Sequence, residues 1–271
     1  MQNTPQLTDR KALESIRRRA DREGGMFLQT TAADDLQDRL SMVNRTFRAP
    51  AIVTPFPELW TERFPEAVII PDEEVLSLRP GAHDVVIHAM ALHWANDPVG
   101  QLIQCRHALK SDGLLLTASF GGQTLHELRA SLAQAESETT GGLSPRILPM
   151  GEIRDMGGLL QRAGFALPVA DGFPITASYE SAFHLMKDLR AMGETNALTN
   201  RRRSFSRRNV FRRAAEIYQH NFSKDERVQA TFDLIFMTGW APDPSQQKPL
   251  RPGSAEQRLA DALGAKENKL P

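Results

Sequence analysis

Two apolar segments on either side of an amphipathic stretch most constrain what this chain can fold into. Residues 84–90 (DVVIHAM) and 114–120 (LLLTASF) are almost continuously apolar, which is typical of strands buried on both faces. Between them, residues 98–109 carry apolar side chains at helical spacing, with a proline in the first turn and Gly113 just beyond the end. A strand, a helix and a strand of these lengths predict a right-handed parallel βαβ unit.

The segments before this unit predict shorter elements. Hydrophobic periodicity indicates helices at about residues 9–22 and 32–43. Five prolines between positions 50 and 71 then leave room only for a strand at 51–53, one brief helix and a strand at 67–70.

The segments after the unit continue the alternation of helices and strands. Thr124 and Glu127 have the spacing of a capping box for a helix that reaches about residue 138. We expect further helices at 151–163, 180–192 and about 206–220, and strands at 165–170, 175–179 and 228–240. The predicted fold class is α/β, a three-layer sandwich around an open, mostly parallel central sheet.

Composition excludes several classes of protein. The 33 basic residues balance 33 acidic ones, so overall charge gives no argument for nucleic acid or membrane as a partner. The single cysteine, Cys105, rules out an intramolecular disulfide and a cysteine-rich zinc site. His83, His88 and His93 recur every five residues, a spacing that does not share a strand face, so we expect no metal. No apolar run approaches the roughly 18 residues of a membrane span, and the amino terminus lacks a signal-peptide core, so we expect a cytoplasmic protein.

Several longer motifs carry a family resemblance. Residues 72–129 resemble the second half of an AdoMet-dependent methyltransferase core, through LHWANDP, LKSDGLLL and GGQTLHELR. More narrowly, they resemble the branch that holds the malonyl-acyl-carrier-protein methyltransferase of biotin synthesis and the related mitochondrial complex I assembly factor. The segments SPRILPMGEIRDMGGLLQRAGFALPVAD, LMKDLRAMGETNAL and IFMTGWAPDPSQQKPLRPGSA are more similar to the assembly-factor side.

This resemblance implies a domain organisation and an activity. Amino-terminal helices would occupy residues 1–48, and a Rossmann-like methyltransferase domain would occupy 49–240 with a helical insertion at about 180–222. An extended polar tail would follow at 241–271. The implied activity is methyl transfer from S-adenosyl-L-methionine, which mainly requires that the methyl donor be positioned against a nucleophile. The assembly-factor side is linked to hydroxylation, so the family also includes oxidative chemistry.

The first half of the domain departs from the family pattern. In the family, a glycine-rich loop follows the first strand, and an acid after the second strand binds the cofactor ribose. Here residues 53–57 are VTPFP, and no glycine occurs between Gly25 and Gly81. Proline and phenylalanine cannot supply the positive φ angles and bare backbone of such a loop. By this alignment the strand at 67–70 is the third, so the cofactor half is shortened and its site degenerate.

The resemblance also suggests site residues. Asp72 and Glu73 match the acidic pair near the adenine, and His93 and Trp94 follow a buried strand where the family places groups that face cofactor and substrate. The alternatives are solvated acids at a strand end and a tryptophan that only packs. We interpret residues 96–97 as a helix cap. No catalytic residue is assigned.

An arginine cluster follows the segment LMKDLRAMGETNAL. Seven arginines fall within residues 201–213, with no acid between Glu194 and Glu216. The cluster comprises Arg201, Arg202, Arg203, Arg207, Arg208, Arg212 and Arg213. It could be a solvated helix face, a contact for an acidic protein partner or substrate, or a nucleic-acid contact.

Three functional hypotheses result. The first is an AdoMet-dependent methyltransferase-family protein with weak or absent methyl transfer. The second is a non-catalytic assembly factor that holds a protein partner through its carboxyl-terminal region, that is, residues 193–196, the arginine cluster and the tail at 239–255. The third and weakest is nucleic-acid binding through residues 201–213.

Overall fold

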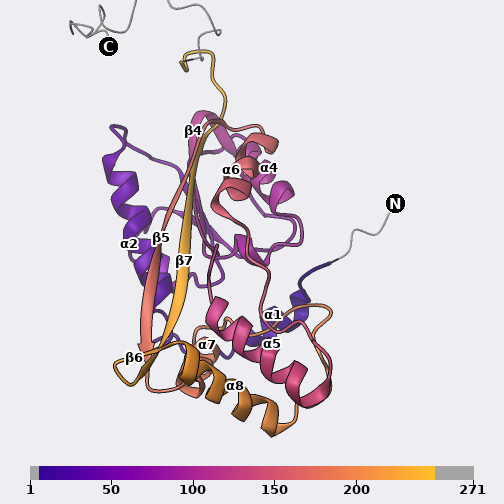
Figure 1. Cartoon of the computed structure of the whole chain (residues 1–271). Helices are drawn as coiled ribbons and strands as arrows, with labels where there is room; N and C mark the ends of the chain where they lie inside the picture. The colour runs from indigo at the N-terminus through magenta and orange to yellow at the C-terminus, as the bar shows by residue number, and fades with distance from the viewer. Residues whose placement is uncertain (1–5, 248–271) are drawn as a thin grey trace, which may run out of the picture.

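A seven-stranded sheet forms the centre of the protein in the computed structural model (Figure 1). The structure describes residues 6–247, so most of the tail expected at 241–271 lies outside the described residues. Neighbouring strands follow the order β2-β1-β3-β4-β7-β5, and β6 pairs with β7. The strands are β1 (Pro50–Val53), β2 (Val68–Ile70), β3 (His83–Ala89), β4 (Leu109–Gly121), β5 (Ala166–Tyr179), β6 (Ser223–Lys224) and β7 (Arg227–Trp240).

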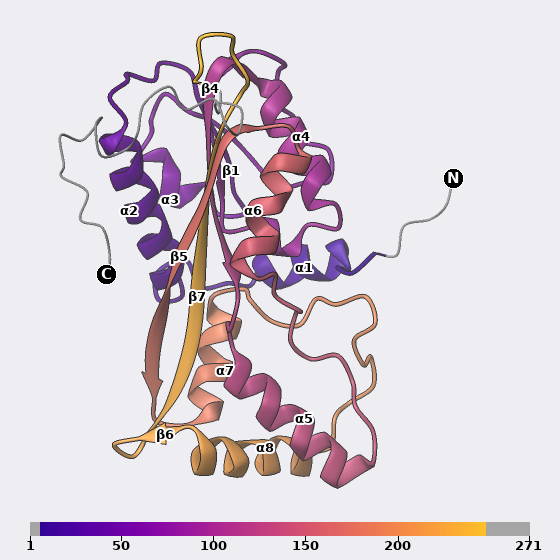
Figure 2. The same ribbon diagram turned by 45° about the horizontal axis from the view of Figure 1, so that its top comes forward.

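Helices cover both faces of the sheet and complete a three-layer sandwich (Figure 2). The helices are α1 (Arg10–Arg17), α2 (Phe27–Met42), α3 (Glu58–Thr61), η1 (Leu92–Trp94), α4 (Pro98–Ala108), α5 (His126–Thr140), α6 (Ile153–Arg162), α7 (Ala182–Ala191) and α8 (Arg208–Asn221). On one face, Leu102 of α4 and Leu160 of α6 pack in a cluster with Val86. On the other, Leu36 of α2 belongs to a cluster with Ile87. Neighbouring residues of β3 thus face opposite layers, and the α/β fold class predicted from the sequence is confirmed.

The βαβ unit predicted from the two apolar runs is present. β3 and β4 pair in parallel, with Val86 opposite Leu115, and α4 crosses between them. Asp97 is the N-cap of α4, because its carboxylate accepts a hydrogen bond from the Gly100 amide at 2.8 Å. β2, β1, β3 and β4 are parallel to one another, and β7 runs antiparallel to both β4 and β5. The carboxyl ends of the four parallel strands therefore meet at one edge, where ligands of such sheets bind.

The first half of the sheet is short. β1 pairs directly with β2, with Ile52 opposite Ile69, and the brief helix α3 crosses between them. In the described part of the chain, β2 is the edge strand on this side. The prolines that flank each element limit its length, because proline cannot continue a helix or donate to a ladder.

The strand prediction for residues 165–179 is wrong in one respect. The sequence indicated two strands separated by a turn near Gly172, whereas β5 is one strand paired with β7 along almost all of its length. Pro174 is tolerated because β5 is an edge strand, so that the missing amide interrupts no second ladder. The irregularity instead falls between Ala166 and Val169, where the register shifts.

The predicted capping box at Thr124 and Glu127 is also wrong. The Thr124 hydroxyl donates to the Gly121 carbonyl at 2.7 Å and accepts from the Asp233 amide at 2.9 Å. Glu127 accepts a hydrogen bond from the Thr231 hydroxyl at 2.6 Å. Both side chains therefore tie the start of α5 to β7 instead of capping the helix.

Below the carboxyl edge of the sheet, α5, α7 and α8 form a separate helical layer (Figures 1 and 2). α7 and α8 fall within the helical insertion expected at about 180–222. Tyr218 of α8 is buried and donates to the Gln229 carbonyl at 2.8 Å, which joins this layer to β7. Within residues 6–247, none of the helices has both the length and the hydropathy that crossing a membrane requires.

Candidate functional site

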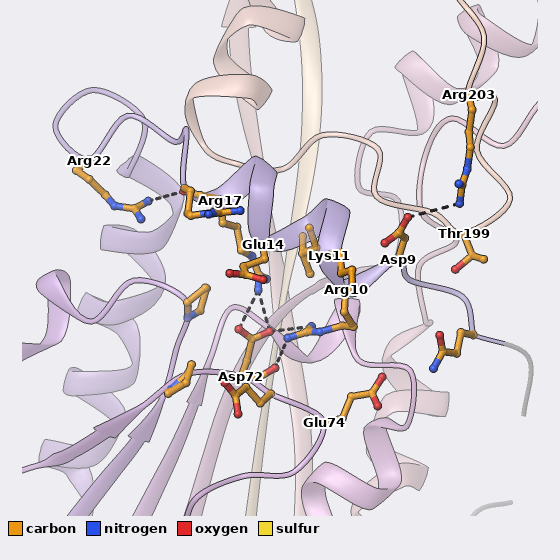
Figure 3. A pocket seen from close by; sticks show the side chains of 16 residues that line it. Asp9, Arg10, Lys11, Glu14, Arg17, Arg22, Asp72, Glu74, Thr199 and Arg203 are labelled. Atoms are coloured by element: carbon orange, nitrogen blue, oxygen red, sulfur yellow. Dashed lines mark hydrogen bonds and ion pairs between the residues drawn. The ribbon is translucent and has the colours of Figure 1, made fainter.

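A large cleft opens beyond the carboxyl ends of β1 and β2. It has a volume of about 800 Å³ and is lined by α1, by Pro55 after β1 and by residues 71–74 after β2 (Figure 3). We call it the α1 cleft. Thr199 and Arg203, far along the chain, line it as well. Two of the predicted site residues, Asp72 and Glu73, are therefore at this cleft.

Asp72 is buried in this cleft between two arginines of α1. One nitrogen of Arg17, Nη1, lies 2.9 and 2.8 Å from the two carboxylate oxygens, and Nη1 of Arg10 lies 3.2 Å from one of them. Burial acts to raise the pKa of Asp72, but the charges of Arg17 and Arg10 outweigh it and lower the pKa. Asp72 is thus an ionised carboxylate that already has two cationic partners.

A buried polar network holds the loop after β2 in place. His88 of β3 bonds Gln101 of α4 at 2.9 Å, and the Gln101 amide donates to the Glu73 carbonyl at 2.9 Å. Burial lowers the pKa of His88, which is therefore neutral. The Glu73 side chain is exposed, so the loop is fixed through its backbone while Asp72 alone of the pair points inward.

The residues after β1 do not fit AdoMet in the manner of the family. Phe56 is buried, and the Arg22 guanidinium lies 4.5 Å from the centre of its ring. The Thr54 amide donates to Ile70 at 3.0 Å, and the Phe56 amide donates to the Thr54 hydroxyl at 3.2 Å. Backbone donors that a glycine-rich loop would present to a cofactor are here bound to β2 and to the loop itself, and a phenyl ring fills space beside them.

A second, smaller pocket lies between the carboxyl edge of the sheet and the helical layer. It has a volume of about 240 Å³, and we call it the Glu194 pocket. Most of its walls are apolar, with aromatic side chains from four elements. These are Trp94 of η1, Phe120 of β4, Phe211 of α8 and Phe232 of β7.

Glu194 is the acidic group of this pocket, and both His93 and Trp94 contact it. The indole nitrogen of Trp94 donates to Oε2 of Glu194 at 2.7 Å, and His93 Nε2 lies 3.3 Å from the same oxygen. The Glu194 side chain is only 7% exposed, and its other oxygen, Oε1, is buried without a hydrogen-bond partner among residues 6–247. The His93 ring centre lies 5.0 Å from that of Phe120, so the histidine is packed behind the pocket.

The segment just before α1 is hydrogen-bonded to the loops that follow η1 and α7. The Thr8 amide donates to Asn96 at 2.8 Å, and Asn96 donates back to the Thr8 carbonyl at 3.1 Å. The Asp9 amide donates to the Ala197 carbonyl at 2.8 Å. Asn96 therefore anchors the amino-terminal segment while its neighbour Asp97 caps α4.

The arginine cluster is largely paired within the protein. Arg201 and Arg203 contact Asp9, Arg202 contacts Glu136, and Arg212 and Arg213 contact Glu216. For Arg207 and Arg208, both exposed, no ion pair is present among the described residues.

The sequence prediction missed Arg10 and Arg17, and it included Glu194 only in a segment expected to hold a protein partner. Arg10 and Arg17 had only the pattern of a basic amphipathic helix, and their common partner lies more than fifty positions away. Glu194 is separated from Trp94 by 100 positions, so no local spacing connects them. Within residues 6–247 no group of three or more His, Cys, Asp or Glu side chains is placed to hold a metal ion. Cys105 is fully buried, which raises the pKa of its thiol to about 12.

Comparisons with known proteins give several relatives. No family model matches the chain. It is 39% identical over 202 residues to "Arginine-hydroxylase NDUFAF5, mitochondrial" of Danio rerio, which covers 74% of this chain and 63% of that protein. The human protein of the same name is 39% identical over 208 residues, covering 76% and 60%. A malonyl-[acyl-carrier protein] O-methyltransferase of Laribacter hongkongensis is 33% identical over 187 residues, covering 69% and 61%.

Each of these alignments covers only part of the relative, and one solved structure has a similar fold. The chain spans about three fifths of the length of these curated relatives. Among solved structures, YcgJ of Bacillus subtilis has a TM-score of 0.50 at 9% identity, covering 78% of this chain and 99% of YcgJ, and this likeness concerns the fold alone. The chain is therefore similar in sequence to the mitochondrial arginine-hydroxylases and to the malonyl-[acyl-carrier protein] O-methyltransferases, over about three fifths of their length.

Proposed function

We propose that this protein is a member of the AdoMet-dependent methyltransferase family that transfers methyl groups weakly or not at all. Two observations support the proposal. Phe56 occupies the place after β1 where the family has bare backbone, and Asp72, the acid nearest to it, is engaged by Arg10 and Arg17. A cofactor would have to compete with two arginines for that carboxylate.

Calorimetry with AdoMet tests this part of the proposal. We expect no binding tighter than about 100 μM, which corresponds to roughly 5.5 kcal/mol. Circular dichroism on the same sample confirms that the protein is folded. Binding tighter than this limit, together with methyl transfer to any acceptor, would contradict the proposal.

We further propose that the protein binds an arginine side chain of a protein partner in the Glu194 pocket. This proposal rests on the observation that Glu194 is buried and that its Oε1 has no hydrogen-bond partner among the described residues. A buried carboxylate with an unsatisfied oxygen is unfavourable by itself and is stabilised when a cationic donor fills the site. The relatives named arginine-hydroxylase act on arginine by their names.

The walls of the pocket also suit a guanidinium group on an aliphatic stem. Trp94, Phe120 and Phe211 provide apolar and aromatic surface, on which arginine packs its methylene groups and its planar cation. Two arginines of the protein also line the pocket, Arg146, which is paired with Glu136, and Arg190. Because Trp94 and His93 both hold Oε2, the carboxylate is fixed with Oε1 left over for a ligand. These contacts support binding; they assign no catalytic residue.

Two model ligands separate charge from shape. We expect acetyl-arginine amide to bind and acetyl-citrulline amide, which has nearly the same shape without the charge, to bind at least tenfold more weakly. Glu194→Gln should abolish this preference. Glu180→Gln serves as the matched control, because Glu180 is an exposed glutamate just before α7. Equal affinities for the two ligands, or a Glu194→Gln protein that retains the preference, would refute an arginine pocket.

The assembly-factor alternative would use the same half of the chain. We propose that Arg207 and Arg208 contact an acidic protein partner, since both are exposed and neither has an ion pair among the described residues. Binding of DNA or RNA that weakens with salt and is lost in Arg207→Ala/Arg208→Ala would favour nucleic acid instead. The cytoplasmic location expected from the sequence stays a prediction, and the arginine-hydroxylase relatives are named as mitochondrial.

A further inference from the structure

We infer that the α1 cleft binds an oxyanion, a carboxylate or phosphate group of a ligand other than AdoMet, through a free edge of the Arg17 guanidinium. Arg17 is 6% exposed and lines the cleft beside Asp72 (Figure 3). This site is distinct from the Glu194 pocket and does not rest on the function proposed for it.

The geometry of Arg17 is the starting point. Its contact with Asp72 uses Nη1 alone. Nε and Nη2 are buried and have no hydrogen-bond partner among residues 6–247. These two nitrogens form one edge of the guanidinium, from which two parallel N–H groups project, and that edge matches two oxygens of a carboxylate or phosphate.

The fold does not need this edge for the Asp72 ion pair. A single cationic nitrogen satisfies that pair, and Arg10 contributes another. Two buried N–H groups left unsatisfied are unfavourable, so they indicate a ligand that supplies acceptors. The two nitrogens are shielded from water, and a ligand reaches them when side chains at the mouth of the cleft move aside.

The rest of the cleft favours an anion over a cation. Six basic residues line it: Arg10, Lys11, Arg17, Arg18, Arg22 and Arg203. Five acids line it as well: Asp72 is paired with Arg10 and Arg17, Asp9 is paired with Arg201 and Arg203, and the others are Glu14, Glu73 and Glu74. Thr199 at the other end of the cleft adds a buried hydroxyl without a partner among the described residues. The unsatisfied groups are thus two donors and one hydroxyl, the complement of an oxygen-rich ligand.

Calorimetry with sodium pyrophosphate, citrate and AdoMet tests the inference on the full chain at low salt. We expect pyrophosphate or citrate to bind with a dissociation constant below about 1 mM, and the stronger of the two identifies phosphate or carboxylate as the preferred group. AdoMet binding tighter than about 100 μM together with methyl transfer would contradict the proposed loss of methyl transfer, whereas failure of both oxyanions to bind would contradict this inference. The two failures are therefore distinguishable.

Two variants and a matched control locate the binding. Arg17→Lys keeps a positive charge beside Asp72 but removes the two parallel N–H groups of Nε and Nη2. We therefore expect the affinity for the oxyanion to fall at least tenfold. Arg19→Lys, an exposed arginine two positions on, should bind as wild type. Asp72→Asn removes a negative charge beside the site and should strengthen binding several-fold, which keeps the test decisive even if Arg17→Lys fails to fold. Equal affinity in Arg17→Lys and Arg19→Lys, or an unchanged affinity in Asp72→Asn, would overturn the inference.

Discussion

Three buried carboxylates illustrate how single residues are held in this protein. Asp72 is paired with two arginines, Glu194 with an indole and an imidazole, and Glu136 with Arg146 and Ser144. In each case a partner lies far away in the chain or on another element, so that the residue type was visible in the sequence but its role was not. Motif resemblance placed His93 and Trp94 near a site, and only the fold brought Glu194 to them.

At Glu136 we expect a stability that depends on acid pH. Burial acts to raise its pKa, but hydrogen bonds from Arg146 and Ser144 lower the pKa to about 2. Because the folded-state pKa is depressed, this contribution is present above the unfolded value near 4.5 and is lost as the pH falls toward 2. Glu136→Gln should therefore lower the free energy of unfolding by about 2 kcal/mol at pH 7.

Urea unfolding of wild type and Glu136→Gln at a series of pH values measures this difference. The gap between the two proteins should narrow steadily below about pH 4.5. Glu138→Gln is the control, since Glu138 is an exposed glutamate of the same helix that pairs with Arg213. A gap that is constant from pH 7 to pH 3 would contradict the assignment to Glu136.

At the scale of elements, buried strands were predictable and long edge strands were not. The apolar runs at β3 and β4 identified the βαβ unit because both strands are covered on both faces. β5 was divided into two because Gly172 and Pro174 interrupt its pattern, whereas its continuity comes from pairing with β7. Local sequence signals a turn there, and the long-range ladder overrides it.

Gly172 should be essential to that ladder. A Cβ added at this position would lie 2.4 Å from the carbonyl oxygen of Leu234 in β7, which a backbone can relieve only by moving. We expect Gly172→Ala to lower the free energy of unfolding by about 2 kcal/mol or more. Gly158→Ala in α6 is the control, because no atom lies within 4 Å of its added Cβ and alanine favours a helix. Thermal unfolding compares Gly172→Ala with Gly158→Ala. Equal melting temperatures would contradict the prediction, because they would show that the β7 backbone moves at Leu234 without loss of stability.

At the scale of the whole molecule, the half of the sheet formed by β1 and β2 is short beside the half formed by β3, β4, β7 and β5. α1 bridges that short half: it contacts Asp72 and rests on a small cluster in which Leu13 packs with Trp94 and Leu198. The resemblance in the sequence predicted the shortening, because the glycine loop was absent. It could not predict that α1 would supply the partners of Asp72.

This small cluster should let α1 open separately from the sheet. Leu13→Ala removes a side chain that is 1% exposed, and we expect faster hydrogen exchange in α1 with little change in β3 and β4. Ile16→Ala, which is only partly buried in the same cluster, should have a smaller effect. Hydrogen exchange followed by mass spectrometry distinguishes this from global destabilisation, in which the exchange of β3 and β4 would rise together with that of α1.

The edge formed by β2 has a consequence for solubility. A sheet that ends on an unpaired strand offers free N–H and C=O groups to other chains, which is a common origin of aggregation. β2 has only three residues, and Pro65 and Pro71 stand on either side of it. Although Val68 is exposed there, so short a strand between two prolines gives an incoming strand few groups to pair with. The two prolines that keep β2 short therefore also protect this edge of the sheet from pairing with a strand of another chain.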